Sequence, residues 1–142
     1  MVKLRKPEKP RDEVNEEGDY IGIITGSSHQ EVNNRLWAVV EFDLLDRTDG
    51  SYIGKKTLWI ELGRNGAVRA GPTGQLRMEK LAKALEAEDA DELDLDQYLH
   101  FPIVCTIVQV GSRFYLNDMR PVTSEEGDIA YGYIARTYGT TT

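Results

Sequence analysis

The sequence has few of the residues that build disulfides, metal centres and nucleophilic active sites. It contains one cysteine, Cys105, and two isolated histidines, His29 and His100. A single cysteine cannot form an intramolecular disulfide, and there is no CxxC pair or histidine-rich stretch that would indicate a zinc site. HExxH, GxSxG and GxxxxGK[ST] motifs are also absent. We therefore expect a buried, reduced thiol at Cys105, no cofactor and no enzymatic activity.

Long apolar runs are missing as well. No stretch approaches the roughly 18 residues of a membrane-spanning helix, and the start MVKLRKPEKPR lacks the apolar core of a secretory signal. With 142 residues, of which 40% are hydrophobic, the chain can build one ordinary core but not two full domains. We expect one soluble domain in the cytoplasm, with no membrane contact.

Charge is unevenly distributed along the chain. The formal net charge is −7, which by itself argues against general nucleic-acid binding. Residues 1–11, however, carry five basic residues and one acidic residue, a net charge of +4, so the remainder carries −11. Residues 1–17 are polar and without a regular period, and we predict a flexible basic arm there. Such arms commonly bind nucleic acid, which makes Lys3, Arg5 and Lys6 candidate contacts; a simple linker is the alternative.

Alternating apolar residues predict five strands. The clearest is RLWAVVEFDLL, residues 35–45, and runs of β-forming residues predict the others over 18–26, 52–62, 101–110 and 113–122. We expect a polar loop, SHQEVNN, after the first strand, a bend or bulge near Gly54, and a two-residue II′ turn at Gly111-Ser112. Apolar residues at helical spacing predict one helix over 74–87, followed by an acidic solvated stretch or a second short turn.

The order β-β-β-α-β-β over residues 18–122 predicts an all-β protein with one helix, specifically an OB-fold. This fold is a five-stranded, partly open Greek-key barrel with its helix between strands three and four. An SH3-like barrel lacks that helix, and a ferredoxin-like fold needs helices after its first and third strands. Residues 123–142 form a C-terminal extension whose three tyrosines argue against simple disorder, although no strong period is visible.

Two tryptophans lie on the outward-facing positions of neighbouring predicted strands. If both strands point their apolar sets inward, Trp37 and Trp59 must share one face. In the tightest register they stand directly opposite each other, and a slip of two residues leaves them diagonal neighbours. With Arg35 and Lys55 beside them, they would form a platform for stacked bases on the face that OB-folds use for oligonucleotides. Ordinary packing under the arm, the C-terminal extension or a second subunit is the alternative.

The segment that joins the third strand to the helix is another candidate contact. Residues 63–78 carry Arg64, Arg69 and Arg77 and no acidic residue, in an otherwise acidic chain. Their four glycines would let the backbone approach a ligand and donate N–H groups. This composition would attract phosphates, although arginines that merely help solubility are the alternative.

Several of these motifs resemble those of bacteriophage OB-fold single-stranded DNA-binding proteins, in particular a phage family long catalogued as of unknown function. The resemblance spans residues 18–122 and is carried by Gly18, Tyr20, Phe42, Gly54, Trp59 and Asn117. It implies a non-catalytic protein that coats single-stranded DNA in phage replication or recombination, with proteins of those processes as further partners. Many such proteins end in an acidic tail, whereas this chain ends IARTYGTTT and carries its acidic run internally, over residues 86–96.

We therefore predict sequence-tolerant binding of single-stranded DNA. Bases would stack on Trp37 and Trp59, while phosphates would contact Arg35, Lys55, Arg64, Arg69 and the arm. An OB-type protein-interaction or dimerisation module is the alternative, favoured by the acidic surplus. A small hydrolase is a third hypothesis, and it would need a buried carboxylate pair in a cleft. A homodimer, and DNA versus RNA as the ligand, stay open.

Overall fold

The computed structural model describes residues 14, 16–64, 72–87 and 94–139. Within them, five strands form one antiparallel sheet: β1 (Gly18–Val32), β2 (Arg35–Leu45), β3 (Tyr52–Arg64), β4 (Pro102–Val110) and β5 (Arg113–Pro121). Two α-helices, α1 (Pro72–Ala84) and α2 (Ser124–Tyr138), and a short 3-10 helix, η1 (Leu95–Tyr98), complete the fold. Neither described α-helix has the length and apolar character needed to cross a membrane.

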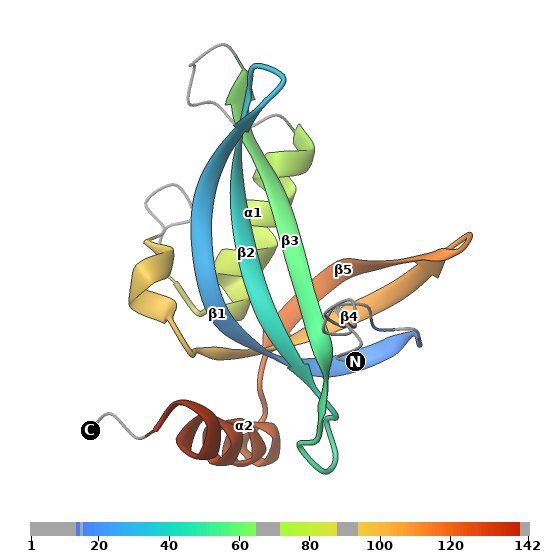
Figure 1. Ribbon diagram of the computed structural model, residues 1–142, viewed down its shortest axis with the longest axis vertical. Helices are drawn as coiled ribbons and strands as arrows, with labels where there is room; N and C mark the ends of the chain where they lie inside the picture. Colours follow the sequence, from blue (N-terminus) through green and yellow to red (C-terminus); the bar gives the residue numbers. More distant parts are fainter. Residues whose placement is uncertain (1–13, 15, 65–71, 88–93, 140–142) are drawn as a thin grey trace, which may run out of the picture.

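The strands follow the order β3-β2-β1-β4-β5 across the sheet (Figure 1). The long β1–β2 hairpin turns at Asn33 and Asn34, whose φ angles are 53° and 62°. This is the geometry of a two-residue I′ turn, which asparagine tolerates. Pairing continues to Val32 and Arg35, so the predicted loop SHQEVNN is wrong: most of it is strand. The Gly111 turn, with φ of 63°, and the bulge beside Gly54 are confirmed.

The sheet is not a closed barrel in the part of the chain that the structure describes. Strands β3 and β5 are its two edges, and no backbone ladder joins them. A side chain spans the gap instead, because Nζ of Lys56 donates a hydrogen bond to the carbonyl of Phe114 at 2.6 Å. In the sequence, Lys56 falls on the same parity as the apolar residues Leu58 and Ile60 and interrupts their alternation, and its reach to β5 accounts for that interruption.

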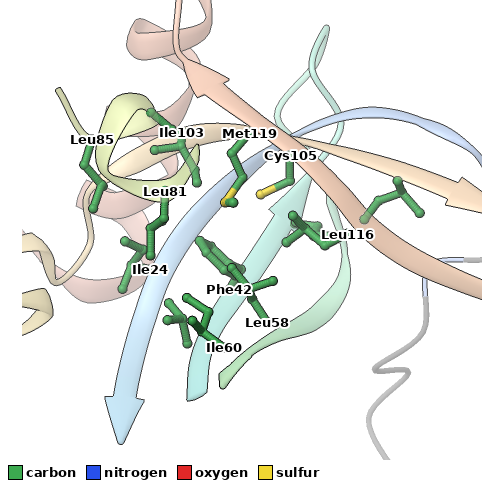
Figure 2. Packing of buried hydrophobic residues seen from close by; sticks show 14 of the residues in the cluster. Ile24, Phe42, Leu58, Ile60, Leu81, Leu85, Ile103, Cys105, Leu116 and Met119 are labelled. Carbon is green, nitrogen blue, oxygen red and sulfur yellow. The ribbon is translucent and has the colours of Figure 1, made fainter. Parts of the chain in front are cut away.

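The main core lies between the curved sheet and α1 (Figure 2). The inward residues Ala38, Val40, Phe42 and Leu44 of β2 are buried as predicted. Leu81 of α1 and Leu85, which directly follows its C-terminal end, add to the same core. Packing here is so close that a Cβ on Gly22 would lie 2.6 Å from Sγ of Cys105. Cys105 is a buried free thiol, as predicted, and burial raises its pKa.

The described end of the predicted arm packs against this core. Val14 is only 1% exposed and belongs to the same cluster of buried residues. The hydroxyl of Tyr20 donates to the carbonyl of Glu16 at 2.8 Å, and a carboxylate oxygen of Glu17 accepts from the backbone N–H of Gln109 at 2.6 Å. Residues immediately before β1 are therefore held by the sheet.

A second α-helix lies where only an extension was predicted, so the prediction of a single helix is wrong. Helix α2 packs on the other face of the sheet, where Ile21, Ile23 and Leu45 form a small second core with Ala130. Gly127 and Gly132 interrupt its apolar period.

The start of α2 is fixed by a capping box and an ion pair. Thr123 and Glu126 cap each other's backbone N–H groups. The carboxylate of Glu126 also accepts two hydrogen bonds from the guanidinium of Arg120, at 2.9 and 3.0 Å. These bonds to Arg120 lower the pKa of Glu126 to about 2.

Buried Asp43 ties α2 to β2. Its Oδ2 accepts hydrogen bonds from the hydroxyl of Tyr133, at 3.0 Å, and from the hydroxyl of Tyr138. Burial and this carboxylate together raise the pKa of Tyr133 to about 12. The ring of Tyr138 stacks on His100 with centroids 4.2 Å apart. Helix α2 is thus anchored over one end of the outer sheet face.

Candidate nucleic-acid interface

Trp37 and Trp59 lie together on the outer face of β2 and β3, opposite the main core. The strands pair Val39 with Trp59 and Trp37 with Glu61, so the register is slipped by two residues from the tightest one. The tryptophans are therefore diagonal neighbours, the second of the two predicted arrangements. Their ring centroids are 6.0 Å apart with planes at 79°, an edge-to-face contact.

The tryptophan pair is only partly covered by the described residues. Trp59 is 38% exposed and Trp37 is half-buried, whereas Val39 between them is 4% exposed. Helix α2 packs at the Leu45 end of the same face and not over the indoles. The pair therefore buries some strand surface and still presents ring surface on which a base could stack.

The two cations predicted beside the tryptophans are placed differently. Nε of Arg35 lies 3.9 Å from Oε1 of Glu61, so its charge is partly balanced within the face. Lys55 is exposed but stands four residues before Trp59 on the same strand, about 13 Å away at a rise of ~3.3 Å per residue. The structure brings Arg35 next to the pair and leaves Lys55 nearer to α2.

The remaining predicted contacts have no described side chains. Lys3, Arg5, Lys6 and Arg69 lie outside the described residues. For Arg64 the backbone alone is described, at the end of β3, where it pairs with Arg35. Their proposed phosphate contacts stay predictions.

A groove of about 600 Å³ opens between the edge strands β3 and β5, directly beside Trp59. Its described lining combines aromatic and basic side chains and includes no acidic residue. Arg77 of α1 is held at its wall, because Nη1 donates to the carbonyl of Trp59 at 2.6 Å. The aromatic and basic lining residues are Trp59, Phe114, Tyr115, Lys56, Arg77 and Arg113.

The sequence interpretation did not find this groove, because its walls come from strands about 55 residues apart in the chain. A signal was present in the segment RFY, residues 113–115, where a cation and two aromatic residues follow the hairpin turn directly. That composition is typical of surfaces that bind single strands. The segment RFY indicates such a surface only in the folded structure, where β5 lies close to Trp59.

A smaller cleft of about 170 Å³ bears on the hydrolase hypothesis. Its lining includes His29, Asp94 and Asp96, but both aspartates are exposed, and Asp94 accepts from the backbone N–H of Asp96 as the N-cap of η1. The buried carboxylates Asp43 and Glu126 line neither this cleft nor the groove. Within the described ranges, no group of three His, Cys, Asp or Glu residues is arranged to hold a metal ion.

Comparison with known proteins gives no family assignment: a scan of protein-family models and a search of curated proteins both find no match to this chain. The resemblance to phage proteins therefore depends on the sequence motifs quoted above.

Proposed function

We propose that this protein binds single-stranded DNA with little sequence preference. The observation that supports this most strongly is the edge-to-face pair of Trp37 and Trp59 on the outer sheet face, which the described residues cover only in part. Every base has an aromatic face, so stacking contributes about 1 to 3 kcal/mol per base without selecting a sequence. A duplex keeps its base faces stacked inside, which favours a single strand as the ligand.

The topology is compatible with an OB-type barrel, which we include in the proposal. In that fold, oligonucleotides lie on strands two and three, and the helix follows strand three. Here the tryptophans lie on β2 and β3, and α1 follows β3. The two sheet edges, β3 and β5, are those that would meet if the barrel closed, and Lys56 already bridges them.

The biological role that we propose is taken from the motif resemblance. A phage-encoded protein of this kind would protect or present single strands during DNA replication or recombination in the host cytoplasm. Proteins of those processes would be its further partners.

A protein-interaction module is a second candidate, favoured by a specific feature of the tryptophan face. Glu41 and Glu61 lie on the same face as the indoles and would repel a polyanion. A partly exposed aromatic pair with an acidic border also fits a basic protein partner or a second copy of the chain. The experiment below separates the two functions.

The test is a fluorescence titration with oligo-dT, because both tryptophans of the chain lie in the pair. Binding should quench their emission, and Trp59→Ala should weaken affinity about 5- to 150-fold, which corresponds to 1 to 3 kcal/mol. Since Trp59 is 38% exposed, the same change should cost well below the ~3 to 5 kcal/mol of a buried aromatic truncation.

Tyr131→Ala is the matched control, since Tyr131 is an exposed aromatic residue on α2. It should leave affinity unaltered. If oligo-dT neither quenches emission nor binds, single-stranded DNA is not the ligand. If Trp59→Ala instead converts a dimer to a monomer in analytical ultracentrifugation, the interaction module is favoured.

A further inference from the structure

The groove between β3 and β5 is a second surface, which adjoins the outer face that carries the stacking proposal. We infer that it holds the continuation of the single strand beyond Trp59, with Tyr115 stacking on a base and Arg113 and Arg77 contacting phosphates. This inference depends on the proposed function and adds the path of the ligand to it.

Trp59 makes the two surfaces continuous. Its ring contacts Trp37 on the outer face, and the residue also lines the groove. A DNA single strand with one base stacked on the indole pair could therefore enter the groove without losing contact with the protein. The volume of about 600 Å³ lies within the ~300 to 1,000 Å³ of typical small-molecule sites, so a short stretch of nucleotides can be accommodated.

The charges on the two surfaces favour a path of the DNA single strand from Trp59 into the groove. On the outer face, the pair is bordered by the carboxylates of Glu41 and Glu61, and Arg35 balances only the latter. The described lining of the groove, in contrast, contains no carboxylate. A polyanion that extends beyond Trp59 is repelled by the carboxylates of the outer face and attracted by the basic residues of the groove. In a chain of net charge −7, a groove whose described lining is aromatic and basic is a distinct surface.

The individual side chains fit these roles. Tyr115 is 44% exposed on β5, across the groove from Trp59, so each wall offers an aromatic ring. Arg113 is exposed at the start of β5, and within the described residues neither it nor Arg77 forms an ion pair. Arg77 uses one N–H on the carbonyl of Trp59, and a guanidinium has five such donors. Both arginines can therefore bind phosphate oxygens.

The test compares short and long oligo-dT, of about 3 and about 12 nucleotides, against groove variants. Tyr115→Ala should weaken binding of the long oligonucleotide at least about 5-fold, and Tyr115→Phe should keep it, because stacking needs only the ring. Arg113→Ala should flatten the slope of log affinity against log salt by about 0.7, the value for one phosphate contact on a single strand. Binding of the short oligonucleotide should change little in either variant.

Arg136→Ala is the control for loss of one positive charge, because Arg136 is an exposed arginine in the last turn of α2. It should leave the salt slope unaltered, and Arg113→Gln repeats the test with a longer side chain. If Trp59→Ala weakens binding while Tyr115→Ala and Arg113→Ala bind the long oligonucleotide like the unmodified protein, the groove inference is overturned and the proposed function stands. If the unmodified protein does not bind oligo-dT, both fail.

Discussion

Gly50 and Gly111 both have positive φ angles, of 74° and 63°, but lie in different surroundings. A Cβ on Gly50 would lie 2.7 Å from Cγ2 of Ile129 in α2, whereas among the described residues a Cβ on Gly111 would meet no atom within 4 Å. We expect Gly111→Ala to cost about 1 kcal/mol of unfolding free energy, from backbone strain alone. Gly50→Ala should cost roughly 2 to 4 kcal/mol, because the clash adds to that strain.

Urea unfolding of the two variants measures this difference. Equal costs would mean that Ile129 moves aside freely and that α2 is loosely attached to the β2–β3 turn. A larger cost at Gly50 would confirm that the turn and the helix pack as one unit.

At the scale of single residues, the sequence predicts which face of a strand a side chain occupies. Trp37 and Trp59 share a face because side chains alternate along a strand. Once the apolar residues of both strands point into the core, both tryptophans must point outward. The sequence could not predict that Arg35 lies beside Glu61, or that Arg77 bonds to the carbonyl of Trp59. Those contacts depend on the register of β3 and on the placement of α1, which residue types alone do not determine.

At the scale of elements, the ion pair at the start of α2 makes the helix sensitive to acid. Glu126 has a pKa of about 2 in the folded protein, below its ordinary value of about 4.3. Its contribution to stability is therefore complete above about pH 4.3 and is lost as pH falls toward 2. Glu126→Gln should lower the unfolding free energy at pH 7 by roughly 1 to 3 kcal/mol, since bonds to a charged group are lost.

The difference between Glu126→Gln and the unmodified protein should shrink below about pH 4 and vanish near pH 2. Chemical unfolding at several pH values measures it. Glu125→Gln is the control, because Glu125 is an exposed acidic residue in the same helical turn. A pH-independent difference would show that packing of the side chain matters more than its charge.

The elements were predictable to different degrees, for physical reasons. Five strands and α1 follow from periods of two and 3.6 residues, which core burial imposes. Helix α2 was missed because Gly127 and Gly132 break its period, although the spacing Thr123-x-x-Glu126 was a capping-box signal. The extra length of β1 was missed because its last residues are polar, and pairing through the Asn33-Asn34 turn, not burial, makes them a strand.

At the scale of the whole molecule, charge is segregated along the chain, because residues 1–11 carry a net charge of +4 and the remainder carries −11. Val14, the first residue that the structure describes, is buried and lines the groove. Deleting residues 1–11 would remove a net charge of +4 and keep Val14. We expect weaker binding of oligo-dT and a shallower salt slope, because fewer phosphates are neutralised.

The melting temperature of that deletion variant should stay within about 2 °C of the unmodified protein, since the buried anchor is retained. Differential scanning calorimetry and the fluorescence titration test the two expectations together. A large fall in melting temperature would instead mean that residues 1–11 pack on the domain.

The solitary thiol of Cys105 offers a way to time the opening of the sheet. It lies in the main core, in contact range of any Cβ placed on Gly22, and it is the chain's sole cysteine. An alkylating reagent can reach it only when strands part, so the labelling rate reports the population of opened molecules whenever reclosing is faster than the chemistry. A nucleic acid that lies across both β3 and β5 would clamp the two edges and slow labelling, whereas one that rests on the indoles alone would leave the edges free to separate.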